Sequence, residues 1–354
     1  MNKKINLVDC TLRDGSYVNR FQFTASDTEY LCRNLEKAGI KYIEVGHGLG
    51  LGAYRKGNEF SAAADDKSYI KAALKGAKKA KTGVFCIPGI ATLDDIELAA
   101  SCGIDFIRIG SNVTEIEASR KYVEKAKAKG LMVCANYMKS YAISPSKFAD
   151  KARLSKAYGI DYLYIVDSAG GMLKEELVDY IKAVRDNVDV EIGYHGHDNL
   201  GLAVSNSIEA MNNGASLIDT SLQGMGRSAG NASTEQVVLL LERMGIHLGI
   251  DKIKILDLGF DFINPLISQT GKNPIDMVSG FALFHSSYIP TIRKYSNKYC
   301  VDPRALIIEL CKVDQINADP VLVDKIASKL KRRSKTVFFS KYHLERYFVN
   351  EQGQ

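Results

Sequence analysis

The chain has 354 residues, of which 46% are hydrophobic and 25% are charged, the composition of an ordinary globular protein. This length exceeds one typical domain, although a single α/β barrel accounts for most of it. No stretch approaches the roughly 18 uninterrupted apolar residues of a membrane span, and the first residues lack the apolar core of a signal peptide. We therefore expect a cytoplasmic protein that does not bind a membrane.

Cysteine spacing and charge distribution narrow the class of protein further. The seven cysteines include no Cys-x-x-Cys pair, which argues against a disulfide framework and a structural zinc site. The net charge of +6 is concentrated in the last third, with a short basic run at 329–335 that contains no aromatic residue. Because no nucleic-acid-binding motif accompanies this run, we interpret it as a solvated helix end and expect no nucleic-acid partner.

Short β-branched runs alternate with amphipathic segments through the first 245 residues. Eight strands are expected at 5–9, 41–45, 82–87, 105–110, 131–137, 161–167, 190–195 and 216–221. Eight helices are expected at 27–38, 66–79, 92–102, 115–129, 145–158, 174–187, 200–213 and 233–244. Eight strand–helix repeats predict an α/β fold of the (β/α)8 type, a TIM barrel. A doubly wound sheet is disfavoured, because the turn after the first strand has no Gly-rich phosphate fingerprint.

The pattern changes after residue 245. Residues 246–333 lack strand signals, and we expect a smaller helical domain that completes the active site or contacts a partner. Its helices are expected at 257–268, 277–296, 303–312 and 320–331. Residues 334–354 are rich in Lys, Tyr and Phe, and we expect this tail to dock on the body of the protein or on a sister subunit.

Two histidines mark the end of the seventh expected strand. In such a barrel the working groups come from the C-terminal ends of the strands and the loops that follow them. His195 and His197, two residues apart, point the same way and can meet one cation. Asp14, on the turn after the first strand, completes a two-His-one-carboxylate set with open positions, which suits a divalent ion. A salt-bridged surface turn is the alternative for Asp14 and its neighbour Arg13.

Other strand ends offer weaker candidates. Ser168 either hydrogen-bonds a substrate carboxylate or caps the next helix, and Asp167 is expected to orient Arg13 or a metal-bound histidine. Glu44 is a candidate supporting carboxylate, and Asn231 a candidate extra ligand or supporting group. A Schiff-base aldolase needs a lysine at a strand end. Among the lysines only Lys139, just beyond the fifth expected strand, lies near such an end, so we disfavour this mechanism.

Four segments carry a resemblance to a known superfamily. They lie at 9–15, 166–171, 195–208 and 219–231, and they resemble the metal-dependent pyruvate-lyase barrels, which include 3-hydroxy-3-methylglutaryl-CoA lyase and 2-isopropylmalate synthase. The chain is most similar to the 4-hydroxy-2-oxovalerate aldolase family, because residues 279–288 and 305–310 also resemble that family's helical domain. The resemblance covers roughly residues 5 to 330.

This resemblance implies roles for individual residues. Asp14, His195 and His197 match the metal ligands, and Arg13 matches the arginine that steadies the enolate. Ser168 matches a substrate-binding serine, and metal-bound His195 borders the same substrate. The implied cofactor is a divalent ion, Mn²⁺ first and Mg²⁺, Co²⁺ or Zn²⁺ as alternatives.

The sequence departs from that family at two positions. The family has a catalytic histidine after the Arg-Asp-Gly turn and an assisting tyrosine on the helical domain, whereas this chain has Tyr17 and His285 there. We hypothesise that the pair is exchanged, with His285 as general base and Tyr17 as its helper. An imidazole with a pKa near ~6.5 accepts a proton more readily than a phenol near ~10. The alternative is that the base is lost and a different reaction is run.

The expected reaction is a metal-dependent class II aldol reaction. A 4-hydroxy-2-oxo acid is cleaved to pyruvate enolate and an aldehyde, or is formed from pyruvate and an aldehyde in the reverse direction. Asn136 and Tyr137 after the fifth strand favour a more polar aldehyde. Expected partners are a small 2-oxo acid, an aldehyde, a second copy of the chain and, by resemblance, an acylating aldehyde dehydrogenase. Two alternatives stay open: a Claisen-type acyl-CoA synthase or lyase, and a non-catalytic barrel with a vestigial metal site.

Overall fold

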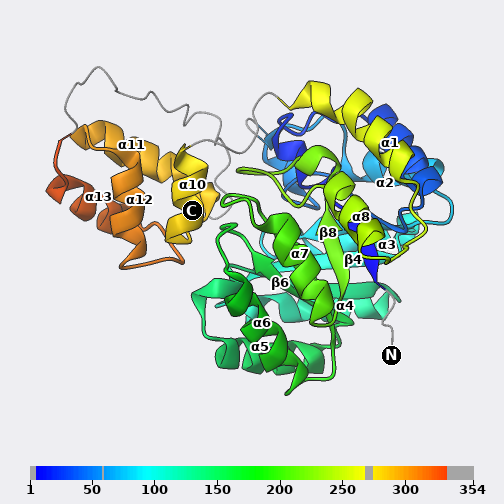
Figure 1. The fold of residues 1–354 in the computed structure, drawn as a ribbon, viewed down its shortest axis with the longest axis horizontal. Coiled ribbons are helices and arrows are strands. Elements are labelled where there is room, and N and C mark those ends of the chain that lie inside the picture. The colour runs from blue at the N-terminus through cyan, green and yellow to red at the C-terminus, as the bar shows by residue number, and fades with distance from the viewer. Residues whose placement is uncertain (1–4, 58–59, 268–273, 333–354) are drawn as a thin grey trace.

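A closed parallel barrel forms the body of the protein. The computed structural model describes residues 5–57, 60–267 and 274–332. Its strands pair in chain order, and β1 closes the barrel on β8. Figure 1 shows helices on the outside of these strands. They are β1 Asn6–Asp9, β2 Tyr42–Val45, β3 Lys81–Cys86, β4 Phe106–Asn112, β5 Met132–Met138, β6 Tyr162–Asp167, β7 Glu191–Gly196 and β8 Ala215–Thr220. The predicted (β/α)8 barrel is therefore confirmed.

Helices follow the strands around the outside of the barrel. They are α1 Ala25–Ala38, α2 Asp66–Gly76, α3 Leu93–Cys102, α4 Arg120–Ala128, α5 Pro145–Tyr158, α6 Lys174–Arg185, α7 Ala203–Asn212 and α8 Thr234–Arg243. Thr24 and Thr92 start α1 and α3 with capping boxes, which satisfy the first backbone N–H groups. Gly39 and Gly103 end the same helices at φ of 101° and 97°, a conformation that glycine adopts without strain.

The barrel has two apolar layers. Aliphatic residues fill the space between strands and helices, and a smaller cluster lies inside the barrel. The inner cluster consists of Val8, Cys10, Phe106, Cys134, Tyr164, Val166 and Leu217. Gly193 leaves room for this cluster, because an added Cβ there would lie 2.5 Å from the Tyr164 ring. All seven cysteines are free thiols, as predicted.

The helices after α8 have other bounds than the helix predicted at 257–268. Helix α9, Lys252–Leu258, continues into the π-helix η7, Gly259–Ile263, and the 3-10 turn η8, Asn264–Leu266. Ile255 and Ile263 belong to the main core of the barrel, so residues 246–267 pack with the barrel. A separate core begins at Ile275. The second hydrophobic core therefore lies after residue 267.

The second core unites four helices, which we call the helical cap. They are α10 Pro274–Ala282, α11 Ile289–Tyr299, α12 Pro303–Cys311 and α13 Pro320–Lys329. The single helix predicted at 277–296 was wrong, because it is broken between α10 and α11 by the 3-10 turn η9, Ser286–Tyr288. Leu283 has a φ of 55° and Pro290 lies in the first turn of α11, and neither fits the interior of a continuous helix.

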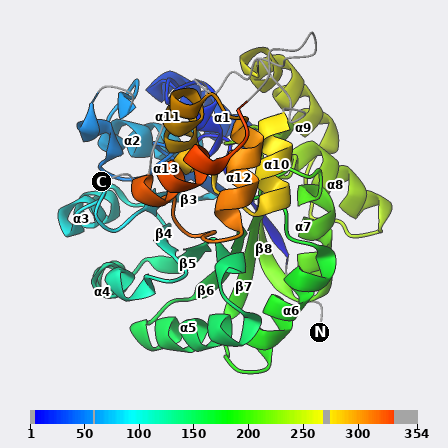
Figure 2. The ribbon, with the colours of Figure 1, turned by 90° about the vertical axis from the view of Figure 1, so that its left-hand side faces the viewer.

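The helical cap covers one end of the barrel (Figure 2). It meets the loops that follow the strands: Ser228 donates to Asp276 of α10 at 3.3 Å, and an added Cβ at Gly171 would lie 2.1 Å from the Gly280 carbonyl oxygen. None of the described helices is long and apolar enough to cross a membrane. The expected tail, 334–354, lies outside the described residues.

Candidate metal centre and active site

Three predicted ligands converge at the mouth of the barrel under the cap. Asp14 follows β1, His195 lies in β7 and His197 follows it directly. One potential ligand atom from each residue lies within 4.8 Å of the other two, and all three side chains are buried. The surface-turn alternative for Asp14 is therefore wrong, since this carboxylate is only 2% exposed.

Both histidines are oriented by hydrogen bonds at Nδ1. His195 Nδ1 lies 2.8 Å from Asp219 Oδ2, and His197 Nδ1 lies 3.3 Å from the Gly230 carbonyl oxygen. Such bonds place the proton on Nδ1 and leave Nε2 as the metal-binding lone pair. Burial lowers the pKa of His197 to about 3, which keeps its imidazole neutral near pH 7. Sequence reasoning missed Asp219, although a carboxylate at the end of β8 was the available signal.

Asp14 is held from both sides. Its Oδ1 accepts from Arg13 Nη1 at 2.6 Å, and its Oδ2 accepts from Asn231 Nδ2 at 2.8 Å. Burial opposes ionisation, but the charges of Arg13 and the nearby histidines outweigh it and hold the pKa of Asp14 well below its usual range. Asn231 Oδ1 is buried and has no hydrogen-bond partner in the described part of the chain. Two oxygen donors and two imidazoles therefore meet here, a set that fits a divalent cation.

Beneath the ligands lies a buried charge network. Arg108 of β4 donates from Nη1 to Glu44 Oε2 at 2.8 Å, pairs through Nη2 with Asp219 and lies 4.4 Å from the Tyr164 ring centroid. Arg13 Nε donates to the same Glu44 oxygen at 2.8 Å. Glu44 thus supports Arg13, whereas Arg108 was missed because it is a single charge within an apolar strand. Arg13 and Arg108 thus pair with three carboxylates. The positive charge of Arg227 also acts on Asp14, so the fixed charges around the ligands are nearly balanced.

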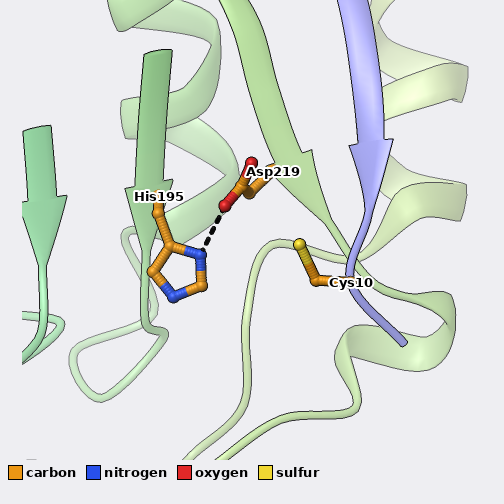
Figure 3. Close-up of side chains that lie close together, drawn as sticks. All are labelled: Cys10, His195 and Asp219. Carbon is orange, nitrogen blue, oxygen red and sulfur yellow. Dashed lines mark hydrogen bonds and ion pairs between the residues drawn. The ribbon is translucent and has the colours of Figure 1, made fainter. Parts of the chain in front are cut away.

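A second group of potential ligands lies close by. Figure 3 shows Cys10 beside His195 and Asp219, whose ligand atoms also lie within 4.8 Å of one another. Asp219 Oδ2 is already shared by His195 and Arg108, and Arg108 Nη1 donates to Cys10 Sγ at 3.3 Å. Burial raises the pKa of the Cys10 thiol well above its ordinary value. We therefore interpret this group as the hydrogen-bonded support of His195.

The two residues at the end of β6 differ in role. Ser168 is buried, and its Oγ accepts the Lys139 backbone N–H at 3.0 Å. The expectation for Asp167 was wrong, because its carboxylate accepts from the backbone N–H groups of Gly171 and Met172 rather than from Arg13 or a histidine. It stabilises the loop after β6, and burial raises its pKa to about 6.

Residues of β5 correct the expected aldehyde pocket. Along a strand successive side chains point to opposite faces. Asn136 points into the barrel, where its Oδ1 accepts from Arg108 Nε at 3.3 Å. Tyr137 points outward to α5, where its hydroxyl donates to the Lys151 carbonyl oxygen at 3.2 Å. Tyr137 therefore does not line the site. Of the two residues that favoured a polar aldehyde, only Asn136 points into the barrel.

Tyr17 and His285 share Arg227 as a neighbour. The Arg227 guanidinium lies 4.7 Å from the centroid of the Tyr17 ring. His285 is buried in the break between α10 and α11, and its pKa is lowered well below the ordinary value by burial and then by the charges of Arg227 and Lys139. Both predicted residues therefore lie within electrostatic reach of Arg227.

The hydrogen bonds of His285 differ from those expected of a general base. Its Nδ1 accepts the Ser287 backbone N–H at 3.2 Å and lies 2.7 Å from Ser287 Oγ. A ring nitrogen that accepts an N–H carries no proton of its own, so the neutral ring is protonated on Nε2. Proton abstraction would need the lone pair at that position. The expectation that His285 is the base does not fit this geometry.

The chain was compared with protein families and with known proteins. The HMGL-like family model matches residues 4–261. The chain is 35% identical over 333 residues to a 4-hydroxy-2-oxovalerate aldolase of Moorella thermoacetica, which covers 94% of this chain and 98% of the relative. It is 36% identical over 335 residues to 4-hydroxy-2-oxovalerate aldolase 2 of Rhodococcus jostii, covering 94% and 97% of the two chains.

Solved structures share the architecture. The N-terminal domain of a protein described as an aldolase from Bacteroides vulgatus superposes with a TM-score of 0.66 at 27% identity, covering 88% of this chain and 97% of that one. The carboxyl transferase domain of Rhizobium etli pyruvate carboxylase gives a TM-score of 0.74 at 14% identity, covering 92% and 60%, which shows the fold alone. From the family match and the identity to these aldolases, the chain belongs to the HMGL-like family and is a carbon–carbon lyase.

Proposed function

We propose that this protein is a divalent-metal-dependent class II aldolase that cleaves or forms 4-hydroxy-2-oxo acids. The convergence of Asp14, His195 and His197 beside Arg13, at the covered mouth of the barrel, carries this proposal. The names of the relatives support the reaction class, and the charges of the site support an anionic 2-oxo acid as substrate.

Asp14, His195 and His197 would hold the metal ion, and Asn231 Oδ1 would be a further oxygen donor. When bound, a divalent ion binds oxygen donors of a 2-oxo acid and polarises its keto group as a Lewis acid. We propose Mn²⁺ first, because a mixed set of imidazole and oxygen donors suits it, with Mg²⁺, Co²⁺ or Zn²⁺ as alternatives.

Arg13 is arranged to stabilise the enolate. Breaking the C3–C4 bond leaves its electron pair on C3, delocalised onto the keto oxygen as pyruvate enolate. Glu44 and Asp14 hold Nε and Nη1 of Arg13, and the Phe85 ring centroid lies 4.6 Å from its guanidinium carbon. This leaves Nη2 for the oxygen on which charge develops, without reorganisation during the reaction.

Ser168 would bind the substrate carboxylate. Because its Oγ accepts the Lys139 backbone N–H, its own proton is available for donation to a carboxylate oxygen. Lys139 itself is fully buried, and its Nζ donates to the Tyr288 hydroxyl at 2.9 Å and to the Ile316 carbonyl at 2.7 Å. This engagement of the amine supports the metal-dependent route over a Schiff base.

Tyr17 and His285, which have Arg227 as a common neighbour, would face the C4 oxygen. The C4 hydroxyl loses its proton as the aldehyde forms, and we assign the acceptor to the phenolate form of Tyr17, whose ring centroid lies 4.7 Å from the Arg227 guanidinium. The helical cap supplies His285, and so would complete the active site. A homo-oligomer and an acylating aldehyde dehydrogenase as partner stay predictions.

The experiment is an assay of pyruvate release from 4-hydroxy-2-oxopentanoate and longer homologues by Mn²⁺-loaded protein. We expect equal amounts of pyruvate and aldehyde, and loss of the activity on addition of EDTA. An acyl-CoA substrate that is consumed without aldehyde formation would instead establish the Claisen-type alternative. No turnover of either class by metal-loaded protein would support the non-catalytic barrel.

A further inference from the structure

The side chain of His285 is fixed by the backbone that follows it. His285 is the N-cap residue of η9, and its Nδ1 accepts the Ser287 N–H. The Ser287 hydroxyl, 2.7 Å from the same nitrogen, can donate to it as well. A proton on Nδ1 would point at the backbone N–H hydrogen, so this turn selects the Nε2–H tautomer.

The surroundings keep the imidazole neutral. His285 is only 3% exposed, and the charged side chains that act on it include the cations Arg227 and Lys139. A second proton on this ring would be buried next to positive charge and would break the bond from Ser287. The ring therefore has one proton and one position for it.

The turn that presents the ring is anchored to the barrel. Tyr288 ends η9, and its hydroxyl accepts from Lys139 Nζ at 2.9 Å and donates to the Ile316 carbonyl oxygen at 2.9 Å. Lys139 also holds Ser168 through its backbone N–H. The residue directly after β5 thus fixes both the expected carboxylate-binding serine and the turn that bears His285, which preorganises the ring.

The free nitrogen of His285 is available to a substrate. Nε2 makes no hydrogen bond within the described part of the chain, while Asp14, His197 and Arg227 are near enough to act on the ring electrostatically. The cap that bears His285 packs on the loops after the strands, so we place this N–H donor at the covered mouth of the barrel. A neutral imidazole in this state is a hydrogen-bond donor to oxygen and cannot accept a proton at Nε2.

We propose that His285 is a fixed, neutral hydrogen-bond donor to the C4 oxygen of the substrate, and that it neither gains nor loses a proton during the reaction. This inference rests on the proposed aldolase function. In the condensation direction the aldehyde oxygen gains negative charge, and a preorganised N–H donor stabilises it. In the cleavage direction the same donor holds the C4 oxygen while the C4 hydroxyl proton passes to the phenolate form of Tyr17.

Substitution of His285 by glutamine distinguishes a hydrogen-bond donor from a general base. Gln can place an N–H near the position of Nε2 but cannot accept the C4 proton, and Ala can do neither. We expect His285→Ala to lower kcat by about 10²-fold, as removal of one oxyanion donor does. We expect His285→Gln to recover most of that loss, and Lys312→Met, which changes an exposed lysine of the cap, to stay close to wild type. Equal loss in His285→Gln and His285→Ala would overturn the donor role.

The tautomer is measured without any turnover. Full-length protein labelled with ¹⁵N-histidine and loaded with diamagnetic Mg²⁺ gives ring ¹⁵N resonances, and the signals absent from His285→Gln belong to His285. We expect a protonated Nε2 and an unprotonated Nδ1. A protonated Nδ1 would contradict the inference even if the enzyme is an active aldolase. A correct tautomer in a protein that cleaves no 4-hydroxy-2-oxo acid would instead overturn the proposed function and, with it, the C4 assignment.

Discussion

The metal centre and the helical cap contribute to one site but are held in different ways. Asp14, His195 and His197 lie on strand ends of a closed barrel, and each is hydrogen-bonded to a buried neighbour. The cap instead reaches the site through a break between two helices, and hydrogen bonds such as that of Lys139 to Tyr288 tie it to the barrel. We therefore expect changes in the centre to abolish activity and changes at the cap to reduce it.

The largest effect is expected when a ligand is removed. We expect His197→Ala to lower turnover at least about 10³-fold, because a lost ligand removes several kcal/mol of stabilisation from the reaction. The matched control is His247→Ala, since His247 is 69% exposed and pairs only with Glu242 among the described residues. Pyruvate release at saturating Mn²⁺ measures both. A His197→Ala protein as active as the control would remove this residue from the centre.

A smaller effect is expected when the residue that orients a metal ligand is changed. Asp219→Asn keeps the shape of the side chain but weakens its hold on His195 and removes the charge that faces Arg108. We expect the metal affinity to fall about 10- to 100-fold, and activity to return at high metal concentration. Titration of chelator-treated protein with Mn²⁺ measures the affinity. If the affinity does not change, Asp219 has no role in positioning His195.

The contribution of the cap is tested at Lys139, the barrel residue that hydrogen-bonds to it. Lys139→Met keeps the length of the side chain but removes the bonds to Tyr288 and Ile316. We expect turnover to fall about 10-fold while the metal affinity stays at the wild-type value, because misplacement of a positioned group lowers rate without touching the centre. Lys312→Met, which changes an exposed lysine of the cap, is the control. A parallel loss of metal affinity in Lys139→Met would show that the two regions are not separable in this way.

The smallest effect on turnover is expected for His47, which is outside the centre. Burial lowers its pKa to about 4, Nδ1 accepts the Leu49 N–H, and the ring stacks on Phe21. Because the folded pKa lies below the unfolded value near 6.5, the neutral ring stabilises the fold above pH 6.5. This stability is lost as the pH falls towards 4, by about 3 kcal/mol in total.

Urea unfolding of wild type and His47→Gln between pH 7 and pH 4 measures this dependence. We expect a flatter pH dependence in the variant and unchanged turnover at pH 7. The same slope in both proteins would show that His47 does not contribute to the acid sensitivity of the fold.

The same two regions also differ in how well the sequence predicts them. The strands, and the convergence of Asp14 with His195 and His197, follow from period-two spacing at strand ends. Hydrophobic residues continue through the break at Leu283 with helical spacing, and a left-handed conformation leaves no signal in a leucine. Pro290 was the available signal, because proline fits the first turn of a helix but not its interior.

The sequence pattern does not predict the surroundings of two further residues, Arg108 and His285. Arg108 is fully buried by pairing with carboxylates from other strands, and pairing across a barrel is not visible along one strand. The role of His285 depends on a backbone N–H two residues later, which spacing and composition do not describe. Sequence therefore predicted which side chains gather at the site better than it predicted their protonation and support.

The binding of one metal ion per chain tests the central claim most directly. Chelator-treated wild type and Asp14→Asn are titrated with Mn²⁺ while free ion is followed by electron paramagnetic resonance and pyruvate release is measured on the same samples. We expect one ion per wild-type chain, activity that returns in proportion to bound ion, and strongly weakened binding in Asp14→Asn. Full activity in the ion-free protein, or the same binding in both proteins, would contradict it.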